Sequence, residues 1–443
     1  MPQHPLPATA LTDLLGCRLP IVLAGMGGVA RSELVAAVTR AGGYGFLGMV
    51  REPLALIERE VAAVRAATDL PFGVNIIPAA TPAKQLAAQV DLLIALRVAS
   101  VELFWEVDAR VVARLRDAGV TVVHQVGSAR EALAAQQAGA QALIAQGVEA
   151  GGHVRGRQRL QELLDEVLAV ARVPVAACGG LADGRDLARA LMQGAHGAVL
   201  GTAFMATEES FAHDAHKRRL VAARASDTVL TEDFHINWPP LAAVRVLRSS
   251  VTSGERGDPF GGQRTPIGDE EGRPIYLFST DSPLRSMTGD FEAMALYAGR
   301  GVDRIDAIVP AAALVAQLEQ DAARHLRLLA DAAPPLASPV CYAPEAQAAQ
   351  RAPLLAALDT LLRAASHRAT AEGCDAALHG AGVVRRAIRT LDGKPWTPAG
   401  DGGAAPALDA AARAVQALLD GVEDAALRKE LEQVVGPWLE GGH

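Results

Sequence analysis

The chain has 443 residues, 50% of them hydrophobic, and a formal charge of −8 at pH 7. This length allows two or three domains built around large cores. The negative charge argues against nucleic acid or an anionic membrane surface as a partner, because those surfaces attract clustered Lys and Arg.

The four cysteines, Cys17, Cys178, Cys341 and Cys374, lie far apart and form no C-x-x-C pair. They predict reduced thiols and no metal site. The first ten residues lack a basic start followed by an apolar core, and no apolar run reaches the ~18 residues that a membrane span needs. We therefore expect a soluble cytoplasmic protein.

Up to about residue 205, short apolar segments alternate with helical segments rich in Ala, Leu and charged residues. The apolar segments are predicted strands at residues 21–24, 44–47, 72–76, 100–104, 121–124, 142–145, 173–177 and 197–200. Eight strand-helix units of this kind are typical of a (β/α)8 TIM barrel, an α/β fold, which we assign to residues 1–205. For the fourth strand, residues 92–98 are as apolar as residues 100–104, and periodicity does not distinguish them.

The predicted first strand is followed by Gly25-Met26-Gly27-Gly28-Val29-Ala30. This segment satisfies the G-x-G-x-x-A pattern of a dinucleotide-binding Rossmann unit. Six further strand-helix units follow the first two, however, without the break expected between two Rossmann halves. We favour the barrel, in which small residues let this loop pass under a flat ring.

The most conspicuous loop follows the predicted sixth strand and runs from Gln146 to Gly156. Gly151 and Gly152 remove two successive side chains, so that backbone N–H groups can approach a flat or anionic ligand, and His153 follows directly. Loops at this end of barrel strands carry the chemistry. The segment predicts a cofactor site with His153 as a base, although ordinary turns share the same glycine pattern.

The loops after the predicted seventh and eighth strands contain Gly179-Gly180 and Gly201-Thr202. These two loops form the phosphate site of many (β/α)8 enzymes. We therefore predict that Gly179, Gly180, Gly201 and Thr202 bind a phosphate, the alternative being that the glycines only turn the chain. Cys178 is interpreted as a small packing residue, the alternative being a reactive thiol.

These segments together resemble the nitronate monooxygenases, formerly called 2-nitropropane dioxygenases, over roughly residues 15–330. The resemblance rests on residues 21–26, 73–75, 146–153, 179–180 and 201–202. It implies that FMN lies across the barrel mouth, with its phosphate on the last two loops. The ring-side cofactor residues that it implies are Ala24, Gly25, Met26, Asn75 and Gln146. Gly25 stands where Pro is usual, and Cys178 stands where Ala is common.

In this family the histidine that matches His153 takes the α-proton of a neutral nitroalkane, and the nitronate then gives one electron to FMN before oxygen reacts. The resemblance thus implies FMN-dependent oxidation of alkyl nitronates and nitroalkanes with O2. Flavin-dependent enoyl-acyl-carrier-protein reductases share a Glu-x-Gly-Gly-His segment, so an NAD(P)H-dependent enoyl or quinone reductase stays open. A flavin-binding regulatory protein is the remaining alternative.

Residues 206–287 are rich in Gly, Pro, Ser and Arg, and we predict that they form a lid or substrate-binding subdomain. Thr207 is expected to cap a helix with Glu208 and Glu209 in its first turn. His235, Asn237 and Trp238 either contact the substrate or, as we favour, hold the lid's own core.

Residues 288–333 are predicted to form helices that return to the barrel, at 290–297 and 308–318. The segment from Tyr297 to Gly301 looks like the family's return to the cofactor phosphate, which makes Tyr297 and Gly299 candidate cofactor residues. Residues 334–443 are predicted to be a Pro-rich linker and a helical C-terminal domain with a stripe of leucines at residues 354–362. Such a module serves packing or oligomer contact, which leaves a homo-oligomer open.

Overall fold

The computed structural model of the chain describes residues 6–239 and 242–332, together with residues 416, 428–429 and 432–433. The predicted Pro-rich linker and nearly all of the predicted helical C-terminal domain therefore lie outside the described residues. One compact unit holds the barrel strands and the segments that follow them up to residue 328. A second unit contains residues 128–133 and 165–172 and the described residues from 329 onward.

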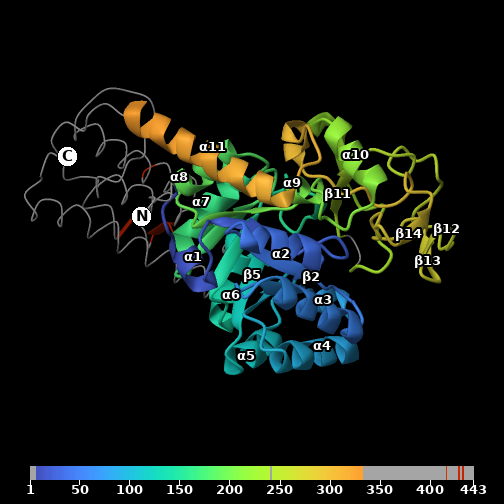
Figure 1. Cartoon of the computed structure of the whole chain (residues 1–443), viewed down its shortest axis with the longest axis horizontal. Helices are drawn as coiled ribbons and strands as arrows, with labels where there is room; N and C mark the ends of the chain where they lie inside the picture. Colours follow the sequence, from blue (N-terminus) through green and yellow to red (C-terminus); the bar gives the residue numbers. More distant parts are fainter. Residues whose placement is uncertain (1–5, 240–241, 333–415, 417–427, 430–431, 434–443) are drawn as a thin grey trace, which may run out of the picture. The chain divides into compact units, whose positions relative to one another are not determined.

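Eight parallel strands close into a barrel, which confirms the predicted (β/α)8 fold (Figure 1). The strands in barrel order are β1 (Ile21–Leu23), β2 (Tyr44–Gly48), β3 (Gly73–Ile76), β4 (Ser100–Leu103), β5 (Thr121–Val126), β6 (Ala142–Gln146), β8 (Val175–Cys178) and β9 (Gly197–Leu200). All eight predicted strands are present. The ambiguous residues 92–95 end a helix that buries Leu93, and the fourth strand is therefore the later of the two candidates.

Helices separate the barrel strands in the sequence. Their bounds are α2 (Ser32–Arg40), α3 (Leu54–Ala67), α4 (Ala83–Ala95), α5 (Ala109–Asp117), α6 (Ala129–Ala138), α7 (Leu160–Val170) and α8 (Gly184–Gln193), with the short α9 (Thr202–Met205) after β9. Side chains fix several of the ends. Asp183 and Asp186 form a reciprocal capping box at the start of α8, and Gly194 ends this helix in the left-handed conformation.

The barrel interior is apolar at its amino-terminal end and polar at its carboxyl-terminal end. Because side chains alternate along a strand, Tyr44, Phe46, Val123 and Ile144 point into the same core. Leu11 and Leu15 of α1 (Ala10–Leu15) close that core from below. The next inward position on each strand lies at the barrel mouth, where the site described below begins.

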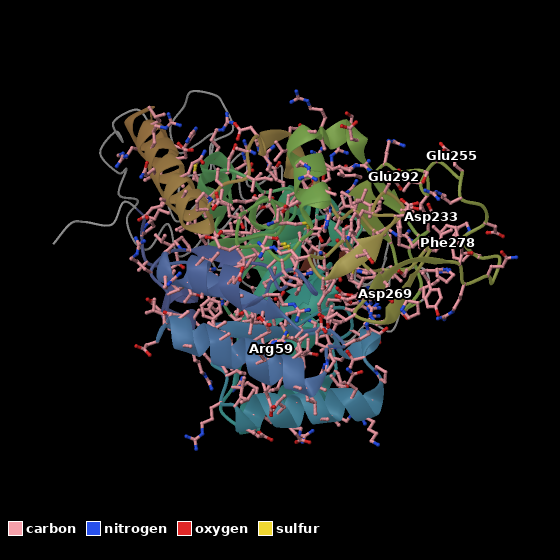
Figure 2. The ribbon with its side chains drawn as sticks, turned by 45° about the vertical axis from the view of Figure 1, so that its right-hand side comes forward. Arg59, Asp233, Glu255, Asp269, Phe278 and Glu292 are labelled. Atoms are coloured by element: carbon pink, nitrogen blue, oxygen red, sulfur yellow. The ribbon has the colours of Figure 1, made fainter. Side chains whose placement is uncertain are left out.

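The predicted lid supplies most of the strands of two small antiparallel sheets. One sheet orders β10 (Thr228–Thr231), β11 (Val244–Leu247) and β7 (Gly152–His153), and the other orders β13 (Arg273–Tyr276), β12 (Pro266–Glu270) and β14 (Met287–Gly289). In Figure 1 the second sheet lies at the right, away from α5, and Figure 2 shows Asp233, Glu255 and Asp269 on the same side of the molecule. The predicted loop at residues 152–153 is thus a strand that joins the barrel to the lid.

Two predictions about the segments after the barrel are wrong. Thr207 caps no helix: it is fully buried and its Oγ1 donates to the carbonyl of Phe204, at 2.7 Å. The helix starts later, as α10 (Asp214–Ala222), where Nδ1 of His213 accepts from the backbone N–H of Ala215 at 3.1 Å. A side chain already bonded to the preceding turn was not available as a cap.

Residues 290–297 form turns rather than the predicted helix. Four successive residues there, Ala293 to Leu296, are at most 1% exposed, whereas a surface helix buries one face only. The backbone N–H of Ala295 donates to the carbonyl of Asp281 at 3.1 Å, so the segment is tied to the lid and has no helical hydrogen-bond ladder. Ala293 and Ala295 belong to the lid core with Phe234.

The helix α11 (Ala311–Ala332) confirms the predicted helix at residues 308–318 from residue 311 onward and extends beyond its predicted end. Its buried residues Ala311, Val315, Leu318 and Ala322 recur at helical spacing. No helix among the described residues is long and apolar enough to cross a membrane.

Candidate functional site

A cavity of about 980 Å³ lies at the carboxyl-terminal ends of the barrel strands, between the barrel and the lid. Its wall contains every residue that the sequence predicted for the site. These residues are Ala24, Gly25, Met26, Asn75, Gln146, Gly151, Gly152, His153, Gly179, Gly180, Gly201, Thr202, Tyr297 and Gly299. The fold thus brings together residues almost 280 positions apart in the sequence, and one large cavity of this kind is the default binding site of a barrel protein.

The floor of the cavity is a ring of polar side chains on four consecutive strands. Asn75, Glu102, Gln125 and Gln146 come from β3, β4, β5 and β6, and each is at most 7% exposed. Sequence reasoning named Asn75 and Gln146 but missed Glu102 and Gln125. Both residues could have been recognised from the sequence. They are polar side chains in short buried strands, and the alternation along each strand directs them into the barrel.

The loop after β1 crosses this floor closely. A Cβ atom added to Gly25 would lie 2.2 Å from Cβ of Asn75 and 2.7 Å from Oε2 of Glu102. A Cβ atom at Gly48 would lie 2.0 Å from the carbonyl oxygen of Met26. The small residues that resembled a Rossmann fingerprint therefore serve close packing of this loop on β2 and β3.

The two predicted phosphate loops meet the return segment at one wall of the cavity. Gly179 and Gly180 have φ angles of 112° and 70°, which only glycine adopts without strain. The hydroxyl of Thr202 accepts from the backbone N–H of Gly299 at 3.0 Å. A Cβ atom at Gly301 would lie 2.6 Å from the carbonyl oxygen of Gly180, so these three segments touch one another.

Arg304 secures the first of these loops. Its Nη2 donates to the carbonyl oxygen of Gly180 at 2.8 Å and to Asp186 at 2.6 Å, and its Nε lies 3.3 Å from Asp183. Both acids belong to the capping box of α8. The side chain thus couples residues 179–180 to the start of a helix, which fixes the shape of a glycine-rich loop that has little rigidity of its own.

The segment that carries His153 is held from both sides. The amide of Gln146 donates to the carbonyl of His153 at 2.9 Å and accepts from the backbone N–H of Arg155 at 3.2 Å. On the lid side, His153 is the register partner of Val244 on β11, and Arg245 donates to the carbonyl of Val148 at 2.8 Å. Gln146 lines the cavity, but both the NH2 group and the oxygen of its side-chain amide bond to this segment and position it.

The imidazole of His153 lies against aromatic side chains. Its ring is stacked on Trp238, with centroids 3.4 Å apart and an interplanar angle of 15°, and Trp105 meets both rings edge to face. Its Nε2 is buried and has no hydrogen-bond partner among the described residues. Loss of solvation, and secondarily the positive charge of Arg51, lower the pKa of His153 well below its ordinary value. The ring is therefore a neutral base at physiological pH.

Of the three lid residues singled out from the sequence, two reach the cavity. Asn237 and Trp238 line it, whereas His235 bonds through Nε2 to the carbonyl of Pro259 at 3.0 Å and packs on Phe260. The lid therefore supplies the aromatic cover of His153, a contact that required knowing how β7 pairs with β11.

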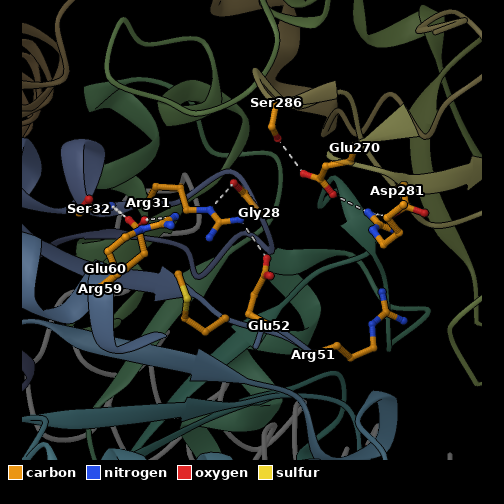
Figure 3. Close-up of polar contacts among 12 residues, drawn as sticks. Gly28, Arg31, Ser32, Arg51, Glu52, Arg59, Glu60, Glu270, Asp281 and Ser286 are labelled. Carbon is orange, nitrogen blue, oxygen red and sulfur yellow. Dashed lines mark hydrogen bonds and ion pairs between the residues drawn. The ribbon is translucent and has the colours of Figure 1, made fainter. Parts of the chain in front are cut away.

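Charged side chains form the outer rim of the cavity (Figure 3). Arg31 pairs with Glu52 at 3.0 Å, and Arg273 pairs with Glu270 at 2.5 Å and with Asp281 at 3.1 Å. Apart from Glu102 on the floor, the wall has six acidic side chains and four arginines. The rim is therefore a network of paired charges with an acidic balance, and it does not attract anions over distance.

Burial also shifts the pKa values of ionisable side chains at the rim. Loss of solvation lowers the pKa of Arg51 and raises the pKa of Glu52, the latter against the pull of Arg31. These shifts follow from enclosure by the lid. Among the described residues no cluster of three His, Cys, Asp or Glu side chains has the arrangement of a metal site.

Comparison with known proteins identifies the relatives of this chain. The family model of nitronate monooxygenase matches residues 8–321. A relative in Mycobacterium tuberculosis, named (3aS,4S,5R,7aS)-5-hydroxy-7a-methyl-1-oxo-octahydro-1H-indene-4-carboxyl-CoA dehydrogenase, is 39% identical over 258 residues, which cover 57% of this chain and 70% of the relative.

Two solved structures are similar over about three quarters of this chain. A nitroalkane oxidase from Streptomyces ansochromogenes is 34% identical, with a TM-score of 0.60, over 72% of this chain and 100% of that chain. FabK from Thermotoga maritima is 29% identical, with a TM-score of 0.64, over 74% of this chain and 99% of that chain.

Proposed function

Because the chain belongs to the nitronate monooxygenase family, whose members are flavin-dependent oxidoreductases, we propose that it oxidises nitroalkanes and alkyl nitronates with O2, using FMN. The observation that carries the proposal is the geometry of His153. The residue lines the cavity, and its Nε2 is buried, neutral and without a hydrogen-bond partner among the described residues. The scattered cysteines support a cytoplasmic location.

The residues of the cavity fit a flavin. Three buried polar atoms on its wall, Oδ1 of Asn75, Oε2 of Glu102 and Nε2 of His153, have no partner in the part of the chain that the structure describes. Buried polar atoms are rarely left unpaired, so a ligand with polar atoms on a flat body is expected there. Gly179, Gly180, Gly201 and Thr202 would receive the phosphate, because the return segment brings their two loops to one wall through the Gly301–Gly180 and Gly299–Thr202 contacts.

His153 would act on the carbon next to the nitro group. The C–H bond breaks, its proton moves to Nε2 of His153, and the electron pair stays on the substrate, which becomes the nitronate. FMN, when bound, supplies electron acceptance and the reaction with O2, which no side chain here provides. Gln146 and the β7–β11 pairing keep the imidazole in place during this step.

The acidic balance of the rim favours a neutral substrate at entry. Six acids, not counting Glu102 on the floor, against four arginines disfavour an anion at the mouth, whereas a nitroalkane enters uncharged. The anion then forms inside, where Trp238 and the lid exclude water from His153. This order explains why the site needs a base at all, since a nitronate arriving from solution would need none.

A second candidate is dehydrogenation of an acyl-CoA thioester. It is favoured by the relative at 39% identity, whose name specifies a carboxyl-CoA dehydrogenase. A thioester, like a nitro group, acidifies the adjacent C–H bond, so the same base would serve both substrates. The two functions differ in what finally accepts the electrons from the flavin. They also differ in the size of the substrate that the cavity must admit.

The test is oxygen uptake by the FMN-loaded protein with nitroethane or propionate 3-nitronate and no nicotinamide. The proposal expects uptake in proportion to substrate. Without uptake, anaerobic bleaching of the flavin by an acyl-CoA would instead support the second candidate. Bleaching by NADH alone would support an enoyl or quinone reductase.

A further inference from the structure

Glu102 is a carboxyl group inside the barrel that the proton transfer at His153 does not use. It lies on β4 between Val101 and Leu103, and it is 2% exposed. Its register partner on β3 is Asn75, and its partner on β5 is Val123. A buried carboxyl is costly unless it is paired, so an apolar residue at this position would serve the barrel core better.

In the described part of the chain, no positively charged side chain offsets the cost of burying the Glu102 carboxyl. Glu102 forms no ion pair there, and its Oε2 has no hydrogen-bond partner. Loss of solvation raises the pKa of Glu102 to about 7, and the nearby polar groups of Gly25 and Asn75 lower this pKa too little to offset the burial. A carboxyl in this environment holds its proton near neutral pH, as a donor rather than as a charge.

The unpartnered oxygen of Glu102 lies under the first loop, where that loop crosses the cavity floor. Oε2 lies 2.7 Å from the position that a Cβ atom on Gly25 would take, and both residues line the cavity. Oδ1 of Asn75, also unpartnered, belongs to the adjacent strand, and Nδ2 of the same amide donates to the backbone oxygen of Glu102 at 3.4 Å. A protonated Glu102 and this amide oxygen present a donor beside an acceptor, which complements a ring edge with alternating carbonyl and N–H groups.

We propose that Glu102 carries a proton on the cavity floor and donates it in a hydrogen bond to the flavin ring, so that FMN binding takes up a proton. This inference rests on the proposed FMN site. A bound ring removes the remaining water from the carboxyl, which favours its neutral form further. FMN affinity should therefore fall as pH rises above neutrality, by up to about tenfold per pH unit for one linked proton.

One other titratable group near Glu102 could give a pH dependence, the thiol of Cys178. Asn75 on β3, Val123 and Gln125 on β5 and Gly25 on the first loop carry no charge. Cys178 on β8 faces the same floor, and burial, followed by the charge of Glu102, raises the pKa of its thiol to about 12. This thiol stays neutral up to pH 9, so Glu102 is the group that would titrate.

The experiment measures FMN binding to the apoprotein by flavin fluorescence from pH 6 to 9, with proton uptake measured by calorimetry in two buffers. Wild type is compared with Glu102→Gln, which keeps a donor but cannot ionise, and with Cys178→Ala as the matched control. The phosphate of FMN titrates equally in all three proteins. We expect affinity to fall with pH in wild type and Cys178→Ala more steeply than in Glu102→Gln, with uptake of up to about one additional proton.

Equal pH slopes and equal proton uptake in wild type and Glu102→Gln would overturn the role of Glu102. Loss of the slope in Cys178→Ala with its retention in Glu102→Gln would also overturn it, by moving the proton to the thiol. A second neutral variant, Glu102→Leu, should share the flat pH dependence but bind FMN more weakly than Glu102→Gln, because it lacks a donor. Wild-type protein that binds no FMN at any pH would refute the cofactor assignment itself, which is a separate result.

Discussion

A single methyl group at Gly151 should disturb the cofactor site, because Gly151 lies where the segment carrying His153 touches the return segment. A Cβ atom there would lie 2.5 Å from the backbone nitrogen of Gly299 and 2.7 Å from the carbonyl carbon of Ala298. Both are backbone atoms, which no side-chain rotation can move. The φ angle of Gly151 lies outside the left-handed region, so Gly151→Ala tests this contact alone.

The expected cost follows from forcing extra volume into a closed contact. Overpacking of this kind costs about 1–3 kcal/mol, and Tm falls by about 2 °C per kcal/mol in a domain of this size. Separation of residues 151 and 299 also opens the proposed phosphate site. If FMN binding loses about 1.4 kcal/mol, its Kd rises about tenfold.

The control variant is Gly197→Ala, which overpacks the opposite end of the barrel. Its Cβ atom would lie 2.8 Å from Cδ2 of Leu11 and 3.0 Å from the carbonyl oxygen of Pro20. Both variants should lower Tm in thermal unfolding, but only Gly151→Ala should weaken FMN binding in a fluorescence titration. Unchanged FMN affinity in Gly151→Ala, with a Tm as low as that of the control, would refute the reasoning.

Three further results are expected. Trp238→Ala should admit water to His153 and raise the pKa of the imidazole. The acid limb of the pH profile of kcat/KM for nitroethane should therefore move to higher pH. An unmoved limb would mean that Trp238 does not desolvate the base. Arg304→Ala should raise the Kd of FMN about fivefold, whereas Arg185→Ala, which removes an ion pair to the same Asp183, should leave it unchanged. The folded pKa of Glu102, about 7, exceeds the unfolded value of 4.5, so wild type loses stability as pH rises from 4.5 to 7. Denaturant unfolding of the apoprotein should therefore show Glu102→Gln gaining about 3 kcal/mol on wild type between pH 4.5 and pH 8, and a constant difference would contradict a buried carboxyl.

The barrel was predictable because its signals are local. Each strand is a short apolar run and each helix carries its own periodicity, so eight repeats identify the closed sheet without any tertiary information. The glycines at 179–180 and 201 were equally readable, since the loops at one end of the strands are known to meet.

The parts that the sequence did not reveal depend on partners distant in the chain. Residues 290–297 have helical composition, but burial on all sides and bonds to the lid override that propensity. The stacking of Trp238 on His153 depends on the pairing of β7 with β11, which no local pattern predicts. Glu102 was overlooked for a different reason, because a single acid within a short strand also occurs on solvated faces.

The most direct test of the account compares His153→Ala with wild type on two forms of one substrate, nitroethane and ethyl nitronate. His235→Ala serves as the control, because this histidine lies in the lid and does not line the cavity. The account predicts that His153→Ala loses about 10²- to 10⁴-fold in kcat/KM for nitroethane and retains most of its activity on ethyl nitronate, which needs no base. Equal losses on both forms, or none on either, would contradict the assignment of His153 as the base.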